Sequence, residues 1–448
     1  MSTHYKITAR NAIHLMLASI STFFRLATKA QQIGDRIAEI PPRLTTWRCN
    51  AAEGCLPQNT SVVLDASFRW IHVVDGYDSC TVPSGELSKT ICPDAITCAR
   101  NCAIEGANYA SAGVHTWSNS LSSSDSSSLT LDMYIDGQES SPRVYLLGED
   151  GDYEDLQLFG QELTFDVDLS KMPCGTNGAL YLSEMSLSGG RSDLNSAGAS
   201  MGTGYCDAQC PVMNFIDGEL DVWEANTVAT ALTPHPCNTT GVYACSGQDC
   251  VGGDSGGICD KSGCVYNTYG QGYHNFYGPE GVVDTTKPFT VVTQFFADSS
   301  NSGGGQPVLK EIRRLYIQND EVITGASSSV SAAMVIDDAF CGDGVFEKLG
   351  GLEGMGQALQ RGMVLVFSIW NDESQFMNWL DSNEAGPCDN KAGDPATILN
   401  KSPGTSVTWS NVRWGDVGST FGSHWNPKGE SLKLKPKIRE MKASKYPT

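Results

Sequence analysis

Residues 218–226 read Gly-Glu-Leu-Asp-Val-Trp-Glu-Ala-Asn, a stretch that places three carboxylates within six positions. If this stretch is a β-strand, Glu219 and Asp221 point to the same face, because side chains alternate with a period of two. Glu224 lies five positions after Glu219 and joins that face only if a bulge or a twist intervenes. Crowded carboxylates raise one another's pKa, and such a site can hold one carboxyl protonated while another is ionised. The alternative is an ordinary acidic surface strand or turn, and this stretch alone does not decide between the two.

The rest of the chain indicates an all-β protein. Among 448 residues there are 47 glycines, many turn-forming clusters and few long helical patterns. Residues 163–169 (Leu-Thr-Phe-Asp-Val-Asp-Leu) place apolar side chains on one face and polar ones on the other. Similar patterns predict strands at residues 61–64, 129–135, 143–147, 289–297, 312–317, 363–370 and 407–414. We expect two stacked antiparallel sheets in a large sandwich or jelly roll, with a helix only near residues 354–361.

Charge and cysteine content exclude several classes of function. A net charge of −21 makes nucleic acid or an anionic membrane surface an unsuitable partner. The 16 cysteines contain no CxxC array and the seven histidines no HExxH pattern, so we expect neither a metal site nor a cofactor. Cysteines in this number indicate disulfides and an oxidising compartment. Sequons at Asn59, Asn238 and Asn400 agree with secretion.

The two ends of the chain differ from its body. Residues 1–30 resemble a secretory signal peptide, since Lys6 and Arg10 precede an apolar run, and the mature protein would start near Gln31. Residues 421–448 hold seven Lys or Arg against two acidic residues and no strand pattern, which predicts a flexible basic tail. Beyond the signal, no stretch approaches the ~20 apolar residues that a membrane span needs. We therefore expect one domain at residues 31–420 and a secreted monomer.

Several tryptophans lie in well-patterned segments, namely Trp70, Trp223, Trp370 and Trp379. An indole ring offers apolar area and an N–H donor, which suits the face of a pyranose ring. The alternative for each tryptophan is packing in the core. Carboxylates and aromatic side chains on one concave sheet would together describe a glycosidase cleft.

Residues 218–226 resemble the catalytic signature of glycoside hydrolase family seven, the fungal cellulases. The likeness continues in order through residues 44–47, 206–210, 232–237, 276–279, 291–295, 363–372 and 413–419. It implies a β-jelly-roll of two curved sheets with a long cleft, and hydrolysis of β-1,4-glucan with retention of configuration. The family's carbohydrate-binding module and its linker have no counterpart here.

By position in the signature, the resemblance makes Glu219 the nucleophile and Glu224 the acid/base, with Asp221 hydrogen-bonded to Glu219. It also places substrate-binding residues in three groups. Asp207, Gln209 and His235 would lie around the site, and Arg143 and Tyr181 along the sugar path. Trp70, Trp370 and Trp379 would be stacking platforms, and Phe68 stands where many members have another tryptophan.

The resemblance implies the disulfides 49–55, 80–102, 92–98, 174–388, 237–259, 245–250 and 264–341. Cys206 and Cys210 remain, and they could bridge each other or stay free. Family members carry a long segment ending in Cys-Cys before the catalytic strand, whereas residues 211–218 here lead directly to Glu219.

Short connections favour an open cleft over a tunnel. The segments 210–219 and 245–259 and the segment after Cys341 are short, and Asp254 stands where the exo-acting enzymes have a product-binding arginine. The resemblance therefore predicts a secreted endo-β-1,4-glucanase. The alternatives are a cellobiohydrolase, or a non-catalytic glucan-binding protein if the missing segment disrupts the site.

Overall fold

The computed structural model describes residues 32–82, 87–118, 126–209, 215–250, 257–298, 306–324, 334–342 and 344–422. The predictions for the signal peptide, for Cys210, for Asp254 and for nearly all of the basic tail lie outside these residues.

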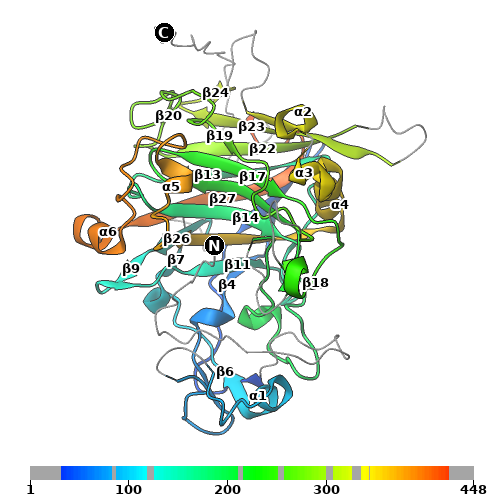
Figure 1. The fold of residues 1–448 in the computed structure, drawn as a ribbon, viewed down its shortest axis with the longest axis vertical. Helices are drawn as coiled ribbons and strands as arrows, with labels where there is room; N and C mark the ends of the chain where they lie inside the picture. The colour runs from blue at the N-terminus through cyan, green and yellow to red at the C-terminus, as the bar shows by residue number, and fades with distance from the viewer. Residues whose placement is uncertain are drawn as a thin grey trace.

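An eight-stranded sheet carries the acidic stretch near its middle (Figure 1). Its strands run in the order β19 (Tyr266–Asn267), β17 (Thr230–His235), β16 (Glu219–Ala225), β14 (Asn177–Ser183), β26 (Met363–Trp370), β11 (Arg143–Leu147) and β4 (Ser61–Leu64). The short β12 (Asp155–Leu156) also pairs with β26. The pairings within this sheet are antiparallel.

A ten-stranded sheet forms the second layer. Its main order is β24 (Glu321–Ile323), β23 (Val308–Gln318), β22 (Phe289–Asp298), β13 (Gln161–Asp168), β27 (Ser406–Asp416), β2 (Thr46–Asn50) and β3 (Gly54–Gln58). Three further strands join it, namely β25 (Val335–Asp337) on β23, β8 (Ser128–Asp132) on β27, and β7 (Val114–Trp117) on β8. Trp117 at the end of β7 pairs with Ser128 at the start of β8, so these two strands are neighbours in one sheet.

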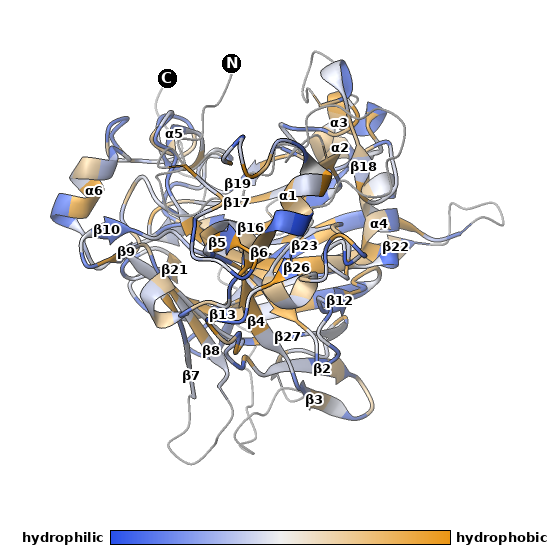
Figure 2. Cartoon of the chain, turned by 90° about the horizontal axis from the view of Figure 1, so that it is seen from below, coloured by the Kyte–Doolittle hydropathy of each residue, from blue (hydrophilic) through white to orange (hydrophobic). Residues whose placement is uncertain are grey.

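The two sheets pack face to face around one core. A single cluster of buried side chains includes Leu180 and Leu220 from the first sheet and Phe165, Val291 and Trp409 from the second. Figure 2 shows hydrophobic residues concentrated on strands near the middle of the molecule, among them β4 and β26. The predicted all-β jelly-roll sandwich is confirmed, and the alternation of apolar residues that predicted it is the pattern that fills this core.

The remaining strands form small sheets outside the two layers. They are β1 (Gln32–Ile33), β6 (Cys102–Ile104) and β5 (Ile71–Val73) in one sheet, and the pairs β9 (Tyr134–Ile135) with β10 (Gln138–Glu139), β15 (Phe215–Ile216) with β18 (Tyr243–Ala244), and β20 (Tyr277–Gly278) with β21 (Val283–Asp284). Figure 1 shows β6 at one end of the molecule, beside α1.

The prediction that a helix occurs only near residues 354–361 is wrong. The described helices are α1 (Ala95–Asn101), α2 (Asp338–Cys341), α3 (Val345–Lys348), α4 (Gly351–Arg361), α5 (Asn378–Asp381) and α6 (Pro395–Lys401). Two of the unexpected ones, α1 and α6, begin after Asp94 and Asp394, whose carboxylates accept the backbone N–H three residues later. Such N-caps stabilise helices too short to show an apolar period. None of the helices in the described part of the chain is long and apolar enough to cross a membrane.

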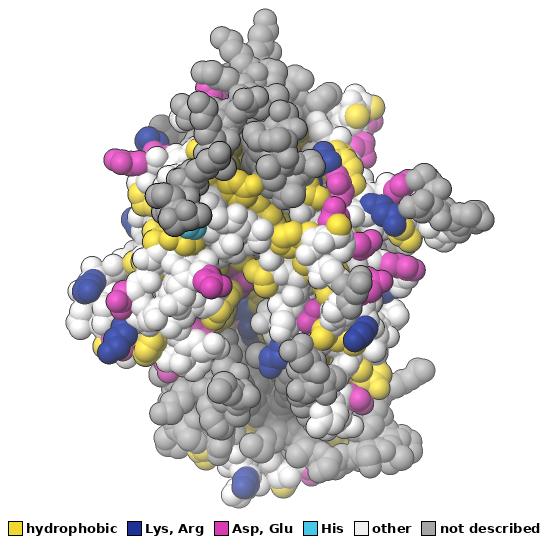
Figure 3. All heavy atoms as spheres, turned by 45° about the horizontal axis from the view of Figure 1, so that its top comes forward, with side chains coloured by type: hydrophobic (Ala, Val, Ile, Leu, Met, Phe, Trp, Pro, Cys, Tyr) yellow, Lys and Arg dark blue, Asp and Glu magenta, His cyan; other side chains and the backbone are white. Residues whose placement is uncertain are grey.

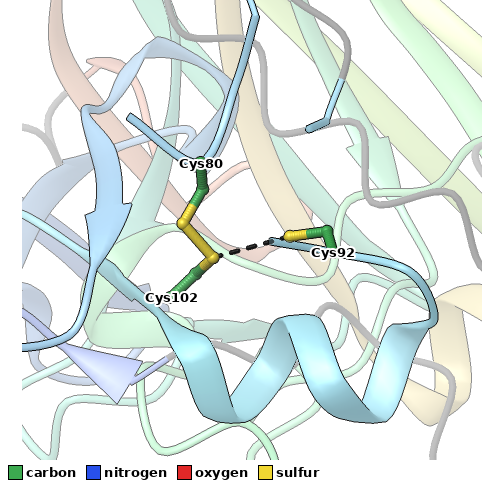
Figure 4. A group of neighbouring side chains, drawn as sticks. All are labelled: Cys80, Cys92 and Cys102. Carbon is green, nitrogen blue, oxygen red and sulfur yellow. Dashed lines mark hydrogen bonds between the residues drawn. A yellow bond between two sulfur atoms is a disulfide. The ribbon is translucent and has the colours of Figure 1, made fainter. Parts of the chain in front are cut away.

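All seven disulfides that the resemblance implies are present. Figure 4 shows the Cys80–Cys102 bond beside Cys92, whose sulfur lies 3.5 Å from that of Cys102 and is itself bonded to Cys98. These sulfurs are therefore engaged in disulfides and are not thiolates that could hold a metal. Cys206 is buried and its Sγ contacts the Asp217 carboxylate.

Candidate active site

Strand β16 contains a β-bulge between its carboxylates. Against β17, Asp221 pairs with Thr233 and Glu224 pairs with Ala231. The chain therefore advances three positions on β16 while it advances two on β17. Against β14, Leu220 pairs with Leu182 and Trp223 with Leu180, which again gives β16 one residue too many. The two irregularities overlap at Val222, so this residue is the extra one on both sides.

The bulge decides which way the later side chains of β16 point. Val222 and Trp223 are consecutive, yet both belong to the core between the sheets. The alternation resumes one residue late, so Glu224 faces away from the core together with Glu219 and Asp221. We call this side of the eight-stranded sheet the outer face. The sequence predicted that the three carboxylates share a face only if a bulge lies between them. That bulge is present.

Each glutamate accepts a hydrogen bond from a neighbouring segment. The backbone N–H of Ala208 donates to Glu219 Oε2 at 3.3 Å, and the Asn177 amide donates to Glu224 Oε1 at 2.8 Å. Glu219 also has a paired strand on both sides, opposite Ser183 of β14 and His235 of β17. The short connection before β16 therefore does not leave Glu219 at a sheet edge.

Asp221 lies between a glutamine and a histidine. Gln209 Nε2 donates to Asp221 Oδ2 at 3.1 Å, and His235 Nε2 lies 3.0 Å from the same oxygen. The other ring nitrogen of His235 lies 2.8 Å from the carbonyl oxygen of Asp260, which can only accept, so Nδ1 carries a proton. This contact fixes the ring orientation and turns Nε2 toward Asp221.

Burial and mutual repulsion change the protonation of these groups. Burial raises the pKa of Glu219 well above its usual value, and the carboxylates of Asp221, Asp207 and Glu224 raise it further. Burial and the Asp221 charge likewise raise the pKa of Glu224, against the Asn177 hydrogen bond, which lowers it. Burial alone lowers the pKa of His235, but Asp221 and the Asp260 carbonyl outweigh burial and the net pKa is raised. The site therefore holds protons at a pH where exposed carboxyls would be ionised.

A row of polar side chains continues from the carboxylates. Tyr205 O–H donates to Asp207 Oδ2 at 2.6 Å, and its oxygen lies 2.9 Å from that of Tyr181. The guanidinium of Arg143 lies 3.5 Å from the centre of the Tyr205 ring and forms an ion pair with Asp65 at 2.7 Å. Figure 3 shows one face of the molecule hollowed near its middle, with acidic and hydrophobic side chains around the hollow and basic ones at its base.

A sequence model described as Glycosyl hydrolase family 7 matches residues 33–220 and 218–421. The chain belongs to glycosyl hydrolase family 7. The two matched stretches meet at residues 218–220, at the start of β16. The resemblance stated from the sequence is confirmed.

Family 7 relatives cover most of the chain. The probable endo-beta-1,4-glucanase celB of Aspergillus terreus is 51% identical over 413 residues, which are 87% of this chain and 94% of that protein. Endoglucanase EG-1 of Hypocrea jecorina is 46% identical over 411 residues, 88% of this chain and 82% of that protein. A solved endoglucanase I complexed with cellobiose is 41% identical, with a TM-score of 0.78 over 87% of this chain and all of that one. A family 7 cellobiohydrolase from Daphnia pulex has the same TM-score and coverage at 33% identity.

The aromatic residues predicted for this family 7 site fall into two groups. Trp370 ends β26 and Trp379 lies on α5, and their ring centres are 6.1 Å apart. Trp70 lies just before β5 of the small sheet, where its ring is 4.3 Å from that of His72. Phe68, at the position where many members have another tryptophan, ends a 3-10 helix and packs against the main core. Trp223 is a fully buried core residue.

The structure adds residues that the sequence did not single out. Asn177, Asp65 and Tyr205 contact Glu224, Arg143 and Asp207, respectively. Asp381 is also buried, and its Oδ2 accepts the Gly175 N–H at 2.6 Å and the Asn226 amide at 2.7 Å. A faint signal existed for Asn177, because asparagine is depleted in strands and here begins an otherwise largely apolar one. Asp65 and Asp381 are recognisable only from contacts between distant segments.

Glu219, Asp221 and His235 also meet the geometric requirement for a cation site, since their ligand atoms lie within 4.8 Å of one another. Each of the three already has a hydrogen-bond partner within the protein. Glu219 accepts from the Ala208 N–H, Asp221 accepts from the Gln209 amide, and His235 Nδ1 donates to the Asp260 carbonyl oxygen. Acid/base hydrolysis by two carboxyls requires no metal, and the expectation of no cofactor stays a prediction.

Proposed function

We propose that this chain is a secreted endo-β-1,4-glucanase that hydrolyses internal bonds of cellulose and related β-glucans with retention of configuration. Residues 1–30 would be its signal peptide, residues 31–420 its catalytic domain, and residues 421–448 a basic tail. As a member of family 7 the chain is a glycoside hydrolase. Its similarity to proteins named endo-β-1,4-glucanase, at 46–51% identity, supports the endo-acting mode.

The bulge at Val222 is the observation that carries the proposed mechanism. It turns Glu219 and Glu224 to one face although their spacing has the wrong parity. Glu219 would attack the anomeric carbon and form a glycosyl-enzyme, while Glu224 protonates the departing glycosidic oxygen. Glu224, then ionised, would take a proton from the water that releases the sugar. Its raised pKa supports its role as the acid of the first step.

Asp221 would tune the nucleophile. Its carboxylate lies close enough to Glu219 to raise the pKa of that group, and Gln209 and His235 hold it in place. In the glycosyl-enzyme Glu219 is esterified and loses its charge, which removes the repulsion from Asp221. Asp207, Arg143 and Tyr181 would bind sugar hydroxyls along the row of polar side chains, and Trp70, Trp370 and Trp379 would stack on sugar rings.

The test is an assay on soluble substituted cellulose. An endo-acting enzyme lowers viscosity quickly while releasing little reducing sugar, and Glu219→Gln should lose activity by roughly 10³-fold or more. Glu384→Gln, a change at an exposed position, is the matched control and should keep wild-type activity. The first anomer released should be β, as retention requires.

The assay also separates the alternatives. Slow loss of viscosity with mostly cellobiose released would indicate a cellobiohydrolase. Binding of cello-oligosaccharides without turnover would indicate a non-catalytic glucan-binding protein and overturn the proposed mechanism.

A further inference from the structure

A buried arginine of the opposite sheet contacts the bulge of the catalytic strand. Arg314 lies on β23 of the ten-stranded sheet and is 4% exposed. Its guanidinium crosses the core and donates to the carbonyl oxygen of Val222, the extra residue of the bulge. A bulge disrupts the hydrogen-bond ladder locally, so the backbone groups of the extra residue need partners from elsewhere. Arg314 supplies one to Val222.

Two further contacts hold the guanidinium at this place. Arg314 Nε donates to Thr293 Oγ1 at 3.0 Å, and the guanidinium carbon lies 5.4 Å from the Trp223 ring centre. Thr293 is the residue opposite Arg314 on the neighbouring strand β22 and is fully buried. The cation therefore contacts both consecutive residues, Val222 and Trp223, that the bulge turns into the core.

Arg314 differs from the other deeply buried arginines in its partners. Arg69 pairs with Glu39 and Arg413 with Asp166, whereas no described residue forms an ion pair with Arg314. Burying a cation without a carboxylate is costly, and leucine or methionine would fill the same space without that cost. An apolar side chain could not provide the hydrogen bonds that Arg314 makes with the Val222 carbonyl, Thr293 and Tyr316, and of these only the first reaches the catalytic strand.

We propose that Arg314 is a positioning residue that fixes the bulge at Val222 and thereby places Glu224 for proton transfer. The proposal rests on the proposed role of Glu224. If the same residues formed no bulge here, regular alternation would exchange the directions of Trp223 and Glu224. Arg314 favours the bulged register because its guanidinium meets the Val222 carbonyl only when Val222 is the extra residue.

The experiment compares Arg314→Met with wild type on aryl cellobiosides whose leaving groups span a wide range of pKa. A displaced Glu224 matters most where the leaving group needs a proton, and little for 2,4-dinitrophenolate, which departs without one. We expect kcat/KM to fall roughly 10- to 100-fold for the poorest leaving groups. For the dinitrophenyl substrate kcat/KM should stay near wild type, so that log kcat/KM depends more steeply on leaving-group pKa.

Arg413→Met is the matched control for the loss of a buried arginine. Arg413 lies in the same sheet, is 1% exposed and donates to Asp166 and to the carbonyl of Thr420. We expect Arg413→Met to be less stable than wild type, while its log kcat/KM depends on leaving-group pKa no more steeply than that of wild type. Thr293→Val removes one contact of the Arg314 guanidinium with little change of shape, and should give a smaller effect of the same kind. It serves as the test if Arg314→Met does not fold.

The outcomes separate the two proposals. The positioning role is overturned if kcat/KM of Arg314→Met falls by the same factor for every leaving group. If Arg314→Met does not fold, the same result in Thr293→Val overturns it. Glu224→Gln should show the steepest dependence of all the variants. If Glu224→Gln shows that dependence and Arg314→Met does not, the positioning role alone fails. If neither shows it, the proposed role of Glu224 fails and the positioning role fails with it.

Discussion

Glu219 and Glu224 are buried at 4% and 6% exposure among other carboxylates, and they hold protons more tightly in the folded protein than in the unfolded chain. A group whose folded pKa is raised by burial and repulsion lowers stability once the pH exceeds its unfolded pKa, because the folded state then binds more protons than the unfolded state. The effect grows with pH up to the folded pKa and is absent below the unfolded pKa of about 4.3.

We therefore predict that Glu219→Gln stabilises the protein at neutral pH. Gln removes the charge and keeps the shape, so the melting temperature at pH 7 should rise by about 1–4 °C. The difference from wild type should shrink as the pH falls and vanish near pH 4. Thermal melts across this range provide the measurement, with Glu384→Gln as the exposed control. A variant that melts below wild type at pH 7 would mean that hydrogen bonds to the ionised carboxylate outweigh its burial.

Sequence patterns identified the strands well and the side-chain contacts of the site only in part. Strands 61–64, 143–147 and 363–370 have the predicted bounds, because their apolar content reflects local burial. The spacing of Glu219 and Glu224 showed that a bulge was required, but not that Val222 is the extra residue. That choice depends on Arg314, which is 92 residues away in sequence. Asn177 reaches Glu224 across 47 residues and was missed for the same reason.

The end of β26 and the short helix α5 together present two indole rings. Trp379 is 38% exposed, so its removal costs less core packing than that of a buried tryptophan would. We predict that Trp379→Ala raises KM for longer cello-oligosaccharides by roughly 10-fold, as expected for one lost stacking contact, with a smaller change in kcat. Trp117→Ala removes another exposed indole, on β7 of the other sheet, and should leave KM unchanged. Equal KM values for both variants would exclude Trp379 as a sugar platform.

The Cys174–Cys388 disulfide joins two parts of the chain that are 214 residues apart in sequence. It joins the segment before β14 to the segment after α5, next to the buried Asp381 that holds Gly175 and Asn226. The chain-entropy relation gives about 5 kcal/mol for closing a loop of this length and about 2 kcal/mol for the Cys49–Cys55 loop.

We predict that Cys174→Ser/Cys388→Ser is much less stable than Cys49→Ser/Cys55→Ser. Thermal melts of the two double variants give the comparison, since they remove the same chemical group and differ mainly in loop length. If the short-loop variant melts at the lower temperature, native contacts at residues 49–55 contribute more than loop entropy does.

The extra residue in β16 also determines how the gene for this strand can change. Loss of the Val222 codon would leave Glu219 and Glu224 four positions apart, so regular alternation alone would turn both carboxylates to the outer face. The indole of Trp223 would stay in the aromatic cluster with Phe165, Tyr277 and Tyr316. The shortened strand would lack only the carbonyl group that Arg314 contacts, a separation of the two roles that scans of single substitutions would never reveal.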